Sequence, residues 1–158
     1  NNPATANVDI TPQIVKKLSI IDNISYIKES TMDVTRVRDI KSLCGDNMSV
    51  FGGIMGYESF LNGADGWVSV GSNLMPAEFS DLYKLSVIDK DVDKARKIYS
   101  FILPIIELVG GHRYTTATKA ALKLMGLNVG PPRPPRLEAS GSDLEWVKKV
   151  VNKYKLKI

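Results

Sequence analysis

Three short runs typical of β-strands alternate with helical patterns in the first 70 residues, and this order constrains the fold most. The runs cover 24–29, 48–51 and 66–70 and are rich in β-branched and aromatic residues. Between them, apolar residues recur at three- and four-residue spacing over 34–44, and a shorter helix is expected around 57–61. Strands that alternate with helices form βα units, so the sequence predicts a parallel sheet.

Helical patterns occupy most of the remaining chain. A capped helix is expected to begin at Thr11-Pro12, ahead of the first strand. After residue 71 only helices are expected, over 76–87, 92–109, 114–125 and 144–156, with a proline-rich segment at 130–136. Pro104 lies within the second of these and should kink or divide it. We therefore expect barrel units over 1–88 and a helical extension packed on the barrel over 89–158.

Three parallel strands make a poor sheet by themselves, because a parallel sheet needs both faces covered and its edges paired. The barrel of eight βα units is the obvious parent of such a pattern. We therefore predict an α/β fold: the last three βα units of a TIM (β/α)8 barrel, followed by a C-terminal helical region. The chain starts on Asn1-Asn2-Pro3 without Met, and we expect that it begins in mid-barrel.

Composition narrows the possible classes of protein. A length of 158 residues with 44% apolar residues predicts one ordinary globular domain. The 21 Lys and Arg exceed the 17 Asp and Glu by four, too few to indicate a nucleic-acid partner. No apolar run approaches a membrane span, and the start does not resemble a signal peptide. With Cys44 as the single cysteine, we expect a cytoplasmic protein that binds neither membrane nor metal.

Lys28 is the candidate for chemistry. Strand alternation places Ile24, Tyr26 and Lys28 on one face, near the carboxyl end of the first strand. Active sites of barrels are built at that end, and desolvation there favours the neutral amine. A neutral amine can attack a ketone and form an iminium ion, an electron sink for breaking or making the neighbouring C–C bond. The alternative is a solvated lysine at a strand end.

Four segments, in order along the chain, carry a resemblance to a known family. They are NNP at 1–3, IKES at 27–30, GADGWVSV at 63–70, and KAALKLMGL at 119–127 followed by the proline-rich segment. Together they resemble the dihydrodipicolinate synthase / N-acetylneuraminate lyase family of class I, pyruvate-handling lyases. The similarity extends over essentially the whole chain.

The resemblance implies a role for each matching residue. Lys28 would form the imine with pyruvate or another 2-oxo acid, without metal or organic cofactor. Gly52, with Gly53 as a second choice, would present backbone near Lys28. Val68 would line the pocket, and Ser30 could reach the substrate. A Tyr one residue before the chain's start would relay protons, and a carboxylate-gripping loop would belong to the absent first half.

Two departures from the family pattern bear on the substrate. Thr5 stands where dihydrodipicolinate synthases typically have an Arg that holds the second substrate's carboxylate, and it carries no charge. Gly53, Ile54 and Met55 stand where sialate lyases place sugar-binding acidic residues. An aldolase or dehydratase of the 2-keto-3-deoxy acid type therefore fits better.

The expected partners follow from the half-barrel prediction. The chain would need the first half of the barrel or a second copy of itself, and the resemblance suggests a homo-oligomer. The alternative is a non-catalytic half-barrel assembly module in which Lys28 is structural. A nucleic-acid surface is the least favoured hypothesis, and we expect no such partner.

Overall fold

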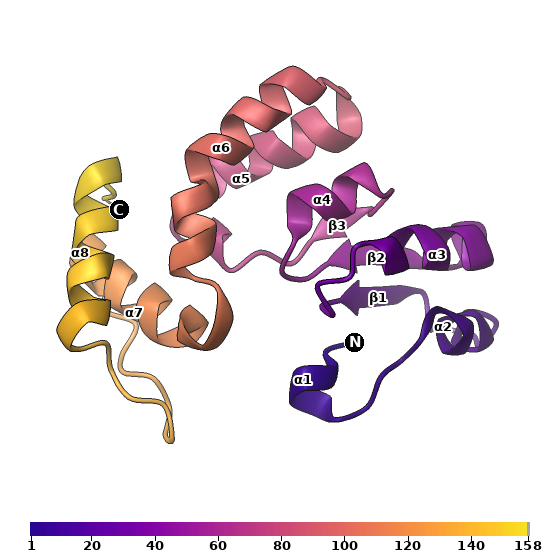
Figure 1. Cartoon of the computed structure of the whole chain (residues 1–158), viewed down its shortest axis with the longest axis horizontal. Helices are drawn as coiled ribbons and strands as arrows, with labels where there is room; N and C mark the ends of the chain where they lie inside the picture. Colours follow the sequence, from indigo (N-terminus) through magenta and orange to yellow (C-terminus); the bar gives the residue numbers. More distant parts are fainter. Residues whose placement is uncertain (158) are drawn as a thin grey trace. The chain divides into compact units, whose positions relative to one another are not determined.

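The chain forms two compact units in the computed structural model, which describes residues 1–157 except for the side chain of His112 (Figure 1). Unit 1 comprises Asn1–Ser69 and Leu82–Ala95, and unit 2 comprises Val70–Asp81 and Arg96–Ile158. The expected boundary between barrel units and helical extension after residue 88 stays a prediction.

A three-stranded parallel sheet lies at the centre of unit 1, as predicted. Its strands are β1 (Tyr26–Glu29), β2 (Ser49–Gly52) and β3 (Gly66–Trp67), in the order β1-β2-β3. The register places Lys28 beside Phe51. The predicted third strand was too long, because β2 ends at Gly52 and offers no further backbone partner beyond Val68.

The outer edge of β1 is paired at its carboxyl end. The backbone nitrogen of Asn1 donates to the Lys28 carbonyl at 2.6 Å, and the Ser30 amide donates to the Asn1 carbonyl at 2.9 Å. These are the two hydrogen bonds of a parallel bridge between Asn1 and Glu29. Asn1 therefore occupies the position that a neighbouring parallel strand would occupy beside β1.

Helices cover one face of this sheet. They are α2 (Pro12–Leu18), α3 (Thr35–Cys44), the 3₁₀ turn η1 (Gly45–Asn47) and α4 (Gly56–Leu61), while α1 (Pro3–Ala6) has no buried residue and follows Asn1 at the edge of β1. Thr11 caps α2 as expected, accepting a hydrogen bond from the Ile14 amide. Helix α2 packs against α3, and α3 and α4 pack against β2. The core between them contains Val15, Val37, Ile40, Met48 and Val50, all at most 1% exposed.

Helices make up the remainder of the chain, as predicted. They are η2 (Gly71–Asn73), α5 (Pro76–Tyr83), the π-helical turn η3 (Lys84–Ile88), α6 (Val92–Leu108), η4 (Gly111–Arg113), α7 (Tyr114–Met125) and α8 (Gly141–Tyr154). Pro104 lies inside α6 without dividing it. The buried side chains of Ile102 and Ile105 anchor the helix on both sides of the proline.

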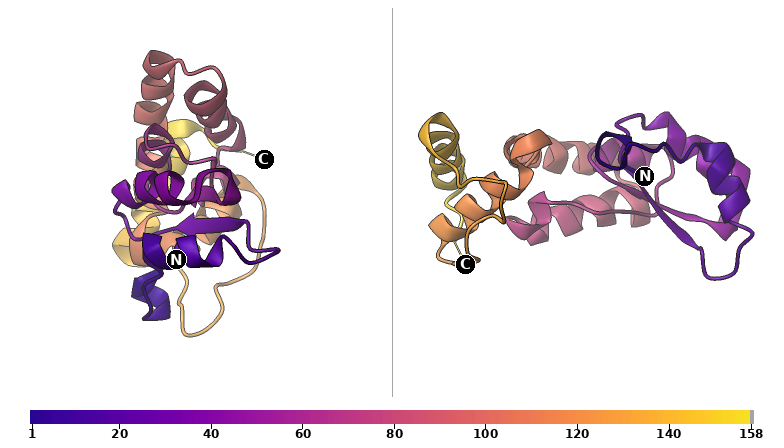
Figure 2. Two further views of the ribbon diagram at one scale, coloured as in Figure 1. Left: turned by 90° about the vertical axis from the view of Figure 1, so that its right-hand side faces the viewer. Right: turned by 90° about the horizontal axis from the view of Figure 1, so that it is seen from below.

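Helices α7 and α8 pack together in unit 2. Residues 126–140 connect them as an extended loop that projects from the helices in the left view of Figure 2. Val147, Val150 and Val151 of α8 are buried, and so are Ala117 and Ala121 of α7. Among the residues that the structure describes, no helix is both long and apolar enough to cross a membrane.

Candidate functional site

Lys28 lies on the face of the sheet that the helices of unit 1 leave open. Its side chain is exposed, and Tyr26 on the same face is 71% exposed. On the opposite face, Glu29 is 5% exposed and Val50 is fully buried. The alternation predicted for the first strand is therefore present, and Lys28 stands near the carboxyl end of β1 on the open face.

Aromatic rings flank Lys28 on this open face. Phe51 is its register partner on β2, and the rings of Phe51 and Tyr26 lie 6.2 Å apart. Phe51 also lies over Gly66 of β3, where a Cβ atom would come within 2.5 Å of the ring. Glycine at position 66 thus lets an apolar ring lie flat on the sheet beside the lysine.

Gly52 stands one residue beyond the register partner of Lys28. A Cβ atom at Gly52 would point toward α4 and lie 2.8 Å from the Cβ of Ser59. Its carbonyl accepts a hydrogen bond from the Val68 amide at 3.0 Å. Gly52 therefore allows α4 to approach β2 closely, while its backbone forms part of the sheet beside Lys28.

Ser30 follows the end of β1 and is only 8% exposed. Its hydroxyl lies against Gly53, where a Cβ atom would be only 1.9 Å from the Ser30 Oγ. The Gly53 amide donates to the Glu29 carbonyl at 2.8 Å. This close approach joins the chain after β2 to the end of β1.

Val68 and Thr5 are the remaining residues that the resemblance selects. Val68 follows β3 directly and is 48% exposed. Thr5 is exposed in the four-residue helix α1, which begins two residues after Asn1. The structure thus brings Lys28, Gly52 and Val68 together at the carboxyl ends of the strands, and it places Thr5 in the segment that follows the edge of β1.

A polar cluster on the other face of β1 was missed by sequence reasoning. The Asn1 side-chain amide donates to Glu29 at 3.0 Å and to Asp9 at 3.1 Å. The Glu29 carboxylate also accepts from the Thr31 amide at 2.7 Å, so this buried carboxylate is well satisfied. The strand alternation places Glu29 on the buried face, and a buried carboxylate needs hydrogen-bond donors. This position was the sequence signal that could have indicated polar partners for Glu29.

Arg36 of α3 completes this cluster. Its guanidinium donates to both oxygens of Asp9, at 2.6 and 2.8 Å. Hydrogen bonds from Arg36, and then from Asn1, lower the pKa of Asp9 to about 2. The Asp9 carboxylate in turn raises the pKa of Arg36. The cluster therefore joins the start of the chain, the end of β1 and α3 through charged hydrogen bonds adjacent to Lys28.

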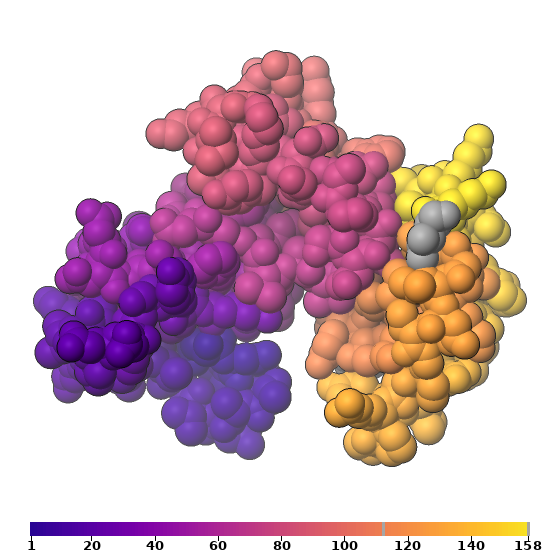
Figure 3. All heavy atoms as spheres, turned by 180° about the vertical axis from the view of Figure 1, so that it is seen from behind, coloured from indigo at the N-terminus to yellow at the C-terminus, as the bar shows by residue number. Residues whose placement is uncertain are grey.

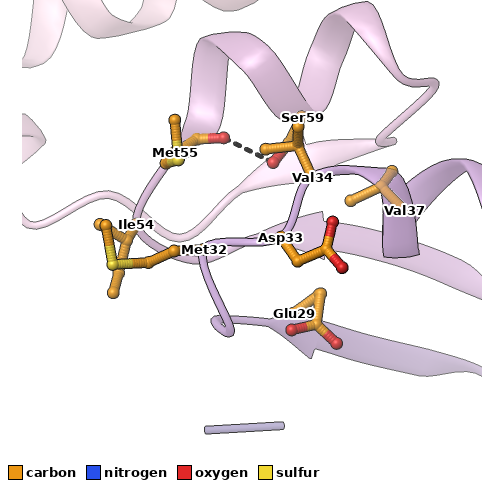
Figure 4. A pocket seen from close by; sticks show the side chains of 8 residues that line it. All are labelled: Glu29, Met32, Asp33, Val34, Val37, Ile54, Met55 and Ser59. Atoms are coloured by element: carbon orange, nitrogen blue, oxygen red, sulfur yellow. Dashed lines mark hydrogen bonds between the residues drawn. The ribbon is translucent and has the colours of Figure 1, made fainter. Parts of the chain in front are cut away.

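The pocket drawn in Figure 4 lies beside this cluster. Its lining residues come from the end of β1, from the segments that follow β1 and β2, and from α3 and α4: Glu29, Met32, Asp33, Val34, Val37, Ile54, Met55 and Ser59. Its volume of about 10 Å³ could hold at most a single water molecule. It is therefore too small for a substrate. In the described part of the chain, no three His, Cys, Asp or Glu side chains are grouped as a metal site requires.

Comparisons with known proteins place this geometry in a family. The model of the dihydrodipicolinate synthetase family matches residues 1–154. The 4-hydroxy-tetrahydrodipicolinate synthase of Caldicellulosiruptor saccharolyticus is 32% identical over 159 residues, which are 100% of this chain and 54% of that protein. The synthase of Thermoanaerobacter sp. strain X514 is 29% identical, over 99% of this chain and 53% of its own.

Solved structures agree with the sequence relatives. Dihydrodipicolinate synthase from Aquifex aeolicus superimposes with a TM-score of 0.93 at 27% identity, over 100% of this chain and 55% of that one. The Acinetobacter baumannii synthase, solved in complex with pyruvate, gives a TM-score of 0.91 at 26% identity, over 99% of this chain and 54% of its own.

The predicted half-barrel fold is confirmed by these comparisons. The chain spans about half the length of the curated relatives it matches, and its three parallel strands and helical region superimpose on half of a (β/α)8 barrel. Because the family model matches nearly every residue, the chain belongs to the dihydrodipicolinate synthetase family.

Proposed function

We propose that this chain supplies the Schiff-base lysine of a class I lyase that acts on pyruvate or another 2-oxo acid. The observation that carries the proposal is the position of Lys28, on the open face of the sheet near the carboxyl end of β1. Barrel enzymes build their active sites at that end. A solved relative in complex with pyruvate supports the choice of substrate class.

The covalent step takes place between the amine of Lys28 and the ketone of the substrate. The neutral amine adds to C2 of the 2-oxo acid, and the resulting carbinolamine loses water to give an iminium ion. The iminium ion accepts the electron pair of a C3–C4 or C3–H bond and becomes an enamine. C3 of the enamine then takes up a proton after cleavage, or bonds to a carbonyl carbon in condensation, and either step restores the iminium ion. Hydrolysis then returns the 2-oxo product and the free amine.

The neighbouring residues would shape the pocket around this imine. Val68 is half exposed on the chain just after β3 and would provide an apolar wall. The backbone at Gly52 would approach the substrate, while Ser30, buried against Gly53, would hold the end of β1 in place. Thr5 offers a hydroxyl but no charge to a second substrate. We therefore favour an aldolase or dehydratase of the 2-keto-3-deoxy acid type.

The open face of the sheet would be covered by the rest of a barrel. Tyr26, at 71% exposed, and Val68, at 48%, are the apolar side chains that such a cover would bury. The cover would be the N-terminal half of the barrel or a second copy of this chain, within a homo-oligomer.

Borohydride trapping tests the proposed role of Lys28. The chain would be incubated with pyruvate and sodium borohydride, alone and co-expressed with the N-terminal half of the Thermoanaerobacter relative, and analysed by intact mass and peptide mapping. We expect a reduced pyruvate adduct on Lys28 in the completed barrel. The adduct should disappear in Lys28→Ala and persist in Lys17→Ala, which removes an exposed lysine of α2.

Two outcomes would contradict the proposal. An adduct that forms equally in Lys28→Ala would show reaction at other amines. An unmodified Lys28 in a correctly completed barrel would leave the chain as a non-catalytic half-barrel assembly module, in which Lys28 is structural.

A further inference from the structure

A second cavity lies in unit 2, between α7, the proline-rich segment and α8. Its volume is about 240 Å³. The apolar part of its wall comes from Ala120, Leu124, Pro131, Pro132, Ala139 and Leu144. The proline-rich segment and the two helices therefore border a space large enough for a small organic molecule. No step of the proposed chemistry uses it.

Hydrogen bonds hold the wall of this cavity in place. The Lys119 ammonium donates to the carbonyl oxygens of Val129 and Gly130, at 2.9 and 3.4 Å. The Thr116 hydroxyl donates to the Leu137 carbonyl at 3.0 Å. Both ends of the connecting loop are thus tied to α7, and Pro132 between them is buried.

Positive charge surrounds the cavity. The lining residues include three lysines, Lys119, Lys123 and Lys148, and one acidic residue, Glu138. Lys119 and Lys123 are four residues apart on α7, a spacing at which like charges destabilise a helix. The whole of unit 2 contains 12 Lys and Arg against 6 Asp and Glu, for a net charge of +6. An anion placed there would relieve the repulsion between the two lysines.

The apolar lining residues favour an apolar ligand body, and the lining lysines favour a negatively charged group on the same ligand. We propose that this cavity is a binding site for a small carboxylic acid with an apolar body. Its apolar body would contact Leu124 and Leu144, and its carboxylate would accept hydrogen bonds from Lys123 and Lys148. Lys148 also donates to Glu145, which leaves two of its three donors available. Figure 3 shows atoms of α7 and of the segment after it, in orange, on the surface of the molecule.

Three probes separate the contributions of charge and apolar body. Benzoate has both features, benzyl alcohol has the ring without the charge, and acetate has the charge without the ring. Each would be titrated into the whole ¹⁵N-labelled chain and followed through backbone amide shifts. We expect saturable shifts with benzoate that concentrate at Ala120, Leu124 and Leu144, and much weaker binding of the other two probes.

Charge variants test whether the cavity is the site. We expect Lys123→Gln to weaken benzoate binding by at most about fivefold, the effect of losing one ion pair at an exposed position. Lys149→Gln is the matched control, because it makes the same charge change on an exposed residue of α8 outside the cavity lining. Its benzoate affinity should equal that of the unchanged chain. The amide spectrum of each variant reports whether the fold is retained.

Other results would overturn the proposal. An equal loss of affinity in Lys149→Gln would indicate general attraction to the positive unit, and equal binding of benzyl alcohol would remove the role of the lysines. The absence of saturable shifts with benzoate would show that the cavity does not bind this class of acid.

Discussion

At the scale of single residues, the Asp9 carboxylate links the segment before α2 to α3 through two hydrogen bonds from Arg36. These bonds lower the pKa of Asp9 from 3.8 to about 2, so the folded chain holds the proton less tightly than the unfolded chain. The resulting stabilisation is complete above about pH 4 and is lost as the pH falls toward 2.

The variant Asp9→Asn should therefore be less stable than the unchanged chain at neutral pH, and the difference should shrink between pH 4 and 2. Urea denaturation at a series of pH values measures it. Asp22→Asn, at an exposed residue between α2 and β1, is the control and should follow the unchanged chain. A constant difference across this range would argue that the amide disturbs the fold for another reason.

Residue positions were predictable from sequence where strand alternation applies. Tyr26 and Lys28 share the open face, as a two-residue period requires. The same period assigned Ser30 to that face, but β1 ends at Glu29, and Ser30 is buried against Gly53. The pairing of Asp9 with Arg36 spans 27 residues, and no local pattern specifies a contact of that range.

At the scale of elements, the start of α4 depends on a glycine. A Cβ atom at Gly56 would lie 1.8 Å from the indole of Trp67, a clash that the ring could avoid only by moving. The indole nitrogen donates to the Gly53 carbonyl at 2.9 Å, which fixes the ring. Gly56→Ala should therefore lower the free energy of unfolding by about 1–3 kcal/mol, as overpacking of a core does.

Urea denaturation, monitored by tryptophan fluorescence, measures this change in the free energy of unfolding. Leu61→Ala is the control in the same helix, because Leu61 is 60% exposed and its truncation should cost less than about 0.5 kcal/mol. Equal stability of Gly56→Ala and the unchanged chain would mean that Trp67 can repack without cost.

The order and type of the elements were predictable from hydrophobic period, while their ends were not. The three strands, the helices and the parallel direction follow from local patterns in 24–70. The third strand was overestimated because its length depends on where β2 leaves the sheet, at Gly52. Helix α6 continues past Pro104 because tertiary burial of Ile102 and Ile105 outweighs the local effect of proline.

At the scale of the whole molecule, an open sheet face and a free backbone edge should bind the rest of a barrel. Within the described residues, β1 is paired on its outer side only where Asn1 meets Glu29, so the outward-facing backbone groups of Tyr26 lie on an unpaired stretch of the edge. Unpaired strand edges bind further strands readily. This property, together with the exposed ring of Tyr26, makes β1 the expected centre of the assembly interface.

Tyr26→Asp should therefore weaken assembly of the chain with the complementary half-barrel by about tenfold or more, because it places a charge where an aromatic anchor would be buried. Sedimentation velocity over a concentration series of the two halves measures this change. Leu137→Asp is the matched control, because it introduces the same charged residue at an apolar position that is 81% exposed. Leu137 belongs to the loop between α7 and α8 in unit 2, away from the strands of unit 1 in the sequence. If both variants assemble with the affinity of the unchanged chain, the open face of β1 is not the assembly interface, and Lys28 would remain in contact with solvent rather than inside a barrel.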